Sequence, residues 1–134
     1  MIKGKYILKI QNLATEEENF EAECPFEAEL ASDSFQGIFI MEGEKHIFEV
    51  KMPQNSIEMK SRNPEAESNL TFDLRTNIGK HEILIHEKPV NLQHEMKLIS
   101  YEYNNTHFVI QYMRLFSGNP EAITKIEVLF HCEN

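Results

Sequence analysis

Cysteine, glycine and tryptophan are scarce or absent in this sequence. It has two cysteines, five glycines and no tryptophan among 134 residues. Cys24 and Cys132 are too far apart to form a metal or redox motif, and we expect two buried thiols in a reducing compartment. Five glycines are too few to favour a phosphate-binding loop. The sequence also contains no nucleophile elbow, P-loop or dinucleotide-binding motif. The sequence predicts no cofactor and favours a non-enzymatic protein.

Basic residues are missing from a long N-terminal stretch. No Lys or Arg occurs between Ile10 and Glu44, where acidic residues are frequent, and the formal net charge is −9. Such a surface repels phosphate backbones and anionic lipids, so we expect neither nucleic acid nor a membrane as partner. No apolar run approaches the length of a transmembrane helix or a signal-peptide core. We therefore expect a cytoplasmic protein.

The sequence is rich in short segments of alternating polarity. The clearest is 20–30, where apolar residues alternate with glutamates. Pro25 in this segment cannot donate to a sheet ladder, which predicts an edge or a bulge. Several such segments, separated by turn signals such as Glu42-Gly43-Glu44, indicate a sandwich or a barrel rather than helices. We predict the all-β class, with residues 1–134 forming a single antiparallel barrel of about 8–10 strands.

The longest predicted strand pair is the hairpin over residues 92–117. Its centre, Asn104-Asn105, suits a two-residue type I′ turn because asparagine tolerates positive φ. This turn would place Glu95 opposite Arg114. Both faces of the hairpin are apolar, which predicts that both are covered. One face would carry a row of seven residues: Lys97, Ile99, Tyr101, Phe108, Ile110, Tyr112 and Arg114.

Six histidines occur, but their spacing predicts no metal site. In the predicted hairpin His107 faces Glu102, which indicates a surface pair. His94 is expected opposite Leu115 on the apolar face, where a histidine satisfied within the core is favoured over a ligand. A further hairpin is predicted to turn at residues 77–79.

Short motifs in the C-terminal half follow one another in a recognisable order. Thr76-Asn77-Ile78-Gly79 leads into Glu82-Ile83-Leu84-Ile85, and the strand segments 96–103, 107–112 and 125–130 follow. In this order the chain resembles the YwiB-like family of uncharacterised bacterial proteins. The resemblance implies a calycin-like, that is lipocalin-like, β-barrel and no established activity. Such barrels often bind small hydrophobic ligands, although a fold does not imply a function.

Two functions from different classes fit such a barrel. The first is non-enzymatic binding of a small apolar or amphipathic ligand inside, where the seven-residue row would line the cavity and Lys97 and Arg114 would hold an anionic head group. The second is a homo-oligomer, such as a homodimer, or another protein-interaction module with a filled interior and an apolar outer face. An enzyme is the least favoured alternative, because it would need convergence of at least two of four polar residues: His94, Glu95, Lys97 and Arg114.

Overall fold

The computed structural model of the chain describes residues 2–13, 19–87 and 91–130. Ten antiparallel strands close into one barrel, which confirms the predicted all-β barrel. Their bounds are β1 Ile2–Asn12, β2 Phe20–Leu30, β3 Ser34–Met41, β4 Glu44–Lys51, β5 Ser56–Arg62, β6 Ala66–Asp73, β7 Ile78–Ile85, β8 Asn91–Tyr103, β9 His107–Phe116 and β10 Asn119–Leu129.

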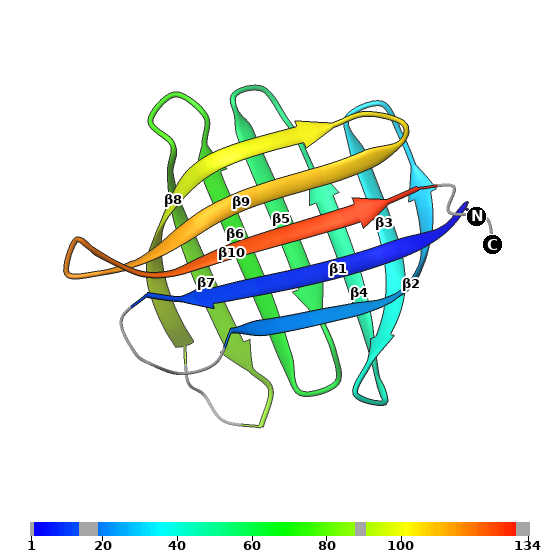
Figure 1. Cartoon of the computed structure of the whole chain (residues 1–134), viewed down its shortest axis with the longest axis horizontal. Helices are drawn as coiled ribbons and strands as arrows, with labels where there is room; N and C mark the ends of the chain where they lie inside the picture. Colours follow the sequence, from blue (N-terminus) through cyan, green and yellow to red (C-terminus); the bar gives the residue numbers. More distant parts are fainter. Residues whose placement is uncertain (1, 14–18, 88–90, 131–134) are drawn as a thin grey trace.

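The strand order around the barrel follows the order in the sequence. Each strand pairs with its neighbours along the chain, and β1 pairs with β10 to close the wall (Figure 1). The ladder between β2 and β3 begins at Phe26, directly after Pro25, so the first half of β2 has no β3 partner among the described residues. Pro25 pairs with Lys5 of β1 and has no partner on β3, so the edge, one of the two alternatives predicted for Pro25, holds on the β3 side. Within the part of the chain described, no helix has the length and apolarity needed to cross a bilayer.

Two tight turns depend on glycine. The β3–β4 turn has φ of 54° at Glu42 and 80° at Gly43, and the β9–β10 turn has 51° at Ser117 and 81° at Gly118. Two successive positive φ values define the type I′ hairpin turn, and glycine adopts the second without a steric cost. The second of these turns lies at the opposite end of the barrel from the β8–β9 turn (Figure 1).

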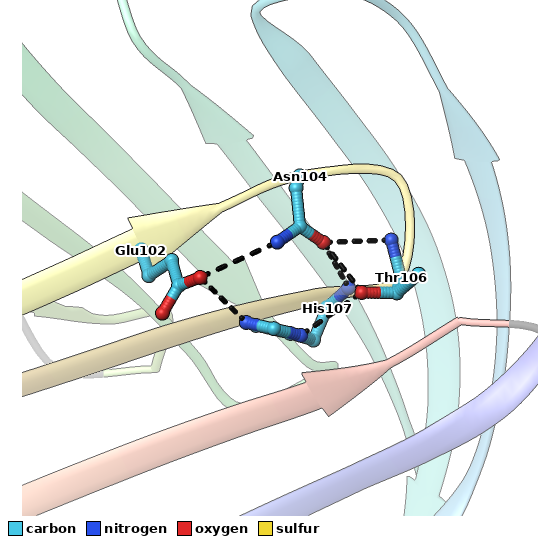
Figure 2. A network of polar contacts seen from close by, with 4 residues as sticks. All are labelled: Glu102, Asn104, Thr106 and His107. Atoms are coloured by element: carbon cyan, nitrogen blue, oxygen red, sulfur yellow. Dashed lines mark hydrogen bonds and ion pairs between the residues drawn. The ribbon is translucent and has the colours of Figure 1, made fainter.

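The β8–β9 turn is not of the predicted type. Positive φ among the described non-glycine residues occurs at four other positions, so Asn104 and Asn105 do not form a type I′ turn. The Asn104 Oδ1 atom accepts hydrogen bonds from the backbone N–H groups of Thr106, at 2.8 Å, and His107, at 3.0 Å (Figure 2). The predicted contact between His107 and Glu102 is confirmed, since Nε2 lies 3.3 Å from Oε1.

The register of this hairpin also differs from the predicted one. A bulge between Leu98 and Ser100 separates two registers, and beyond it Met96 pairs with Arg114 while Glu95 pairs with Leu115. The predicted pairing of Glu95 with Arg114 was wrong, as was that of His94 with Leu115. A change of one residue in register moves every side chain to the other face. The interior therefore combines alternate residues of both strands: Met96, Leu98, Phe108, Ile110 and Tyr112.

Two other predicted strand boundaries differ from the observed ones. The β6–β7 turn covers residues 74–77 rather than 77–79, because Asp73 already pairs with Ile78. Strand β10 begins at Asn119, several residues before the predicted start, and its register shifts between Pro120 and Ala122. A bulge is one of the few places where a sheet accepts proline, because the backbone there makes no regular ladder bond.

One end of the barrel is filled by aromatic rings, and we call it the closed end. The Phe35 ring lies 5.3 Å from Phe108, 5.2 Å from Phe130 and 5.6 Å from Tyr103, measured between centroids. The Tyr103 hydroxyl donates to the Ala31 carbonyl oxygen at 2.8 Å, which ties the β8–β9 hairpin across the barrel end. Further rings continue the packing toward the middle: Tyr6, Phe26, Phe39 and Phe48.

Candidate functional site

A cavity of about 490 Å³ lies in the other half of the barrel interior. Its volume falls within the range of roughly 300–1,000 Å³ that is typical of small-molecule sites. No Asp or Glu of the described chain lines it, although the formal net charge of the protein is −9. The apolar lining includes Leu8, Ile10, Phe20, Met59, Leu70, Met96, Ala122 and Ile126, and the polar lining includes Ser61, Ser68, His81, Tyr112, Arg114 and Thr124.

The polar residues of the cavity form a belt across neighbouring strands. Ser61 of β5 pairs with Ser68 of β6, and His81 of β7 pairs with His94 of β8. Arg114 of β9 follows on the next strand. The facing wall comes from β1 and β2 and is mainly apolar. We call these five residues the polar belt. All of them except His94 line the cavity, and with the apolar wall they give it an amphipathic lining.

His81 and Ser68 form the closest polar contact in the belt. The Ser68 Oγ and His81 Nε2 atoms are 2.5 Å apart, and both side chains are half-buried. The centroids of the His81 and His94 rings are 6.2 Å apart. Burial lowers the pKa of His81, and the nearby His94 and Arg114 lower it further because positive charge opposes protonation. His81 is therefore an uncharged hydrogen-bonding group at neutral pH.

Arg114 brings the one full positive charge found in the described lining of the cavity. Its Nε atom lies 3.3 Å from Oε2 of Glu121, which stands at the β10 bulge. The geometry makes this an ion pair without a hydrogen bond, and the buried Arg114 Nε has no hydrogen-bond partner among the described residues. Both side chains are more than a third exposed, and such pairs contribute only about 0–1 kcal/mol. A ligand oxyanion could therefore replace the Glu121 carboxylate as the partner of Arg114 at little cost in free energy.

Two buried phenols contribute hydroxyl groups but no charge. Burial raises the pKa of Tyr112 to about 12, although a hydrogen bond with Thr124 lowers it in part. Burial also raises the pKa of Tyr6, and the nearby Tyr112 and Cys24 add to that effect. Both phenols stay protonated at neutral pH, so Arg114, paired with Glu121, is the charged residue of the described lining.

The structure separates the seven residues of the predicted row into three environments. Tyr112 and Arg114 line the cavity. Phe108 and Ile110 are fully buried in the core and do not line it. The other three lie at the surface: Lys97, Ile99, which is 45% exposed, and Tyr101, which is 46% exposed.

The bulge at residue 99 changes which of the preceding residues of β8 face inward, so Lys97 pairs with Met113 instead of lying opposite Tyr112. Lys97 and Arg114 are consequently not brought together to hold one head group. Glu95 and Lys97 are exposed, whereas His94 is half-buried within the belt. Ligand binding by the seven residues stays a prediction. Within the described ranges, no three His, Cys, Asp or Glu side chains are grouped to hold a metal ion.

Sequence reasoning missed Ser61, Ser68 and His81. A lone serine carries no signal of its own. The alternation of Gly79, His81 and Ile83 was the available clue, because residues two apart on a strand share a face.

Comparison with known proteins identifies the fold. No protein-family model and no curated protein matches the chain. The crystal structure of the ywiB protein from Bacillus subtilis is similar, with a TM-score of 0.64 and 10% sequence identity, over 98% of this chain and 92% of that chain. The fold is YwiB-like. At such low identity the likeness extends to the fold alone, so the YwiB-like barrel has to be interpreted from its own cavity.

Proposed function

We propose that the protein binds a small amphipathic ligand with an anionic head group inside its barrel, without enzymatic chemistry. The observation that carries the proposal is the 490 Å³ cavity with Arg114 in its polar wall and no described carboxylate in its lining. This would be a lipocalin-like use of a barrel interior, and we propose the cytoplasm as its place of action.

The lining supports one orientation of the ligand. An apolar tail would lie along Leu8, Ile10 and Ile126, where burial contributes about 25 cal/mol per Å² of apolar surface. The head group would lie at the polar belt, where the unsatisfied Arg114 Nε–H can donate a charge-assisted hydrogen bond. The aromatic closed end limits how far the tail can extend. A ligand with one apolar tail and one oxyanion therefore matches both walls.

Native mass spectrometry combined with titration tests this proposal. We expect either a co-purified anionic amphipath in one-to-one stoichiometry or, after its removal, binding of decane-1-sulfonate. The variant Ser61→Phe, which fills the cavity, should abolish binding while thermal unfolding shows that the barrel still folds. A protein that carries no adduct and binds no decyl compound would overturn the proposal.

A second candidate, self-association, is favoured by one observation on the outer surface. Ile78 is 53% exposed at the start of β7, and Ile99 on the adjacent β8 is 45% exposed. Apolar side chains on neighbouring strands can form an interface between two copies. Sedimentation velocity tests this candidate. A concentration-dependent dimer that the double variant Ile78→Lys/Ile99→Lys converts to a monomer would favour it, and a monomer at all concentrations would exclude it.

A further inference from the structure

We infer that Ser68 and His81 complete the head-group site beside Arg114, and that an oxyanion binds there together with one proton taken up by His81. This inference rests on the proposed binding function and adds the chemistry of the head group and its dependence on pH.

Three belt side chains supply the geometry. Ser68, His81 and Arg114 come from β6, β7 and β9, and all three line the same cavity. Protonation makes both ring nitrogens of a histidine donors, so Nε2 of charged His81 donates to Ser68 Oγ across their 2.5 Å contact. The Ser68 hydroxyl hydrogen is then free to donate to a ligand oxygen. Arg114 donates to the same oxyanion from its unsatisfied Nε–H.

The groups around His81 determine the direction of the effect. The described groups that titrate or carry charge near it are His94 on β8 and Arg114 on β9, while β6 contributes the neutral Ser68. Glu121 on β10 lies against Arg114, and the phenols of Tyr6 and Tyr112 line the same cavity without charge. In the free barrel the positive neighbours oppose protonation of His81. A bound oxyanion adds a negative charge and favours it.

The sign of the pH dependence follows from this exchange. The pKa of His81 is lowered in the free protein, and the bound oxyanion raises it. A ligand that raises a pKa binds more tightly as the pH falls through the interval between the free and bound values. His81 is the one histidine among the described residues that line the cavity. We therefore expect uptake of one proton.

Calorimetric titration with three decyl compounds tests the inference. Decane-1-sulfonate keeps its charge at every pH used, and decan-1-ol and decyltrimethylammonium supply neutral and cationic heads on the same tail. From about pH 8 to about pH 6 we expect sulfonate affinity to rise by up to about tenfold per pH unit, the limit for one linked proton. Decan-1-ol should bind more weakly and without pH dependence. Titrations in two buffers of different ionisation enthalpy should show net proton uptake with the sulfonate alone.

Three histidine variants locate the proton. His81→Gln, which keeps a side-chain donor, should remove the pH dependence of sulfonate binding. His94→Gln should keep the dependence and move it to higher pH, because the contribution of His94 that lowers the pKa of His81 is lost. His107→Gln is the matched control, since His107 pairs with Glu102 at the β8–β9 turn and does not line the cavity, and it should behave as the wild type.

The outcomes separate the inference from the proposed function. Sulfonate affinity that is independent of pH, or a slope that survives His81→Gln, overturns the inference while the binding function stands. Equal affinity for the sulfonate and the alcohol also overturns it. Failure of all three decyl compounds to bind, together with the absence of a co-purified adduct, overturns the proposed function itself.

Discussion

Replacing Gly79 with alanine should measure how tightly the wall beside the cavity is packed. Gly79 on β7 pairs with Phe72 on β6, and a Cβ atom at position 79 would lie 2.4 Å and 2.6 Å from two atoms of the Phe72 ring. It would also lie 2.8 Å from the Thr71 carbonyl oxygen. Phe72 is 0% exposed, and its ring centroid is 5.6 Å from that of Tyr112, so the ring has little room to move.

Overpacking a buried site costs about 1–3 kcal/mol. Because the clash involves a ring and a backbone oxygen, we expect Gly79→Ala to lower the free energy of unfolding by about 2–3 kcal/mol. Equilibrium unfolding in urea measures this loss of stability, which should appear as a lower midpoint concentration of urea with an unchanged m-value. The double variant Gly79→Ala/Phe72→Leu should recover about 1 kcal/mol relative to additivity, since leucine removes the clashing ring atoms.

Gly43→Ala is the control for this prediction. A Cβ at position 43 would meet no atom within 4 Å, but φ there is +80°. Its cost of about 1–2 kcal/mol would come from the left-handed backbone alone and should be additive with Phe72→Leu. A Gly79→Ala variant within about 0.5 kcal/mol of the wild type, or additive with Phe72→Leu, would refute the packing argument.

Three further predictions concern the core, the thiol and pH. Tyr103→Phe removes the hydroxyl that donates to two backbone carbonyls and should lower unfolding free energy by about 1–2 kcal/mol in urea; no change would mean that the hairpin needs no tie at the closed end. In a Cys132→Ser background, Cys24 should react with Ellman's reagent only on unfolding, because burial and Glu23 raise its pKa; fast native labelling would contradict its burial. Folding lowers the pKa of His81, so the unfolded chain binds the proton more readily and the free energy of unfolding should fall as the pH drops below about 6.5. This fall should be less steep in His81→Gln. Equal pH dependence of stability in the two proteins would exclude His81 as its source.

The barrel could be predicted from the sequence because its main signal is local. Alternation in residues 20–30 predicts one buried and one exposed face of β2, and the structure buries Cys24, Phe26 and Ala28 while the glutamates stay exposed. Such a pattern needs no knowledge of the neighbouring strand, because side chains alternate along any single strand.

Register could not be predicted in the same way, because it depends on a turn and a bulge. Asn104 uses its side chain as an acceptor for two backbone N–H groups instead of adopting positive φ. The bulge after Leu98 has no residue that marks it in the sequence, yet it places Lys97 on the opposite face from Tyr112 and Arg114. Two of the seven predicted lining residues, Tyr112 and Arg114, therefore line the cavity.

The polar belt could not be predicted because it depends on pairing between strands. Ser68 and His81 are 13 residues apart, and their contact requires the β6–β7 turn at residues 74–77. The predicted turn at 77–79 would have placed other residues opposite each other. Only the folded structure brings Ser68, His81 and Arg114 to one cavity.

The pairing between β1 and β10 makes closure of the barrel depend on β10. All other pairings join consecutive strands and can form as hairpins while the chain is being synthesised. Until β10 is available, β1 and β9 each present a row of unpaired backbone groups, which are templates for association with other chains. Loss of β10 would therefore convert the closed barrel into an open sheet with β1 and β9 as its edge strands. In the cell, such a truncated chain would aggregate and be a target of quality control, rather than fold as a slightly smaller barrel.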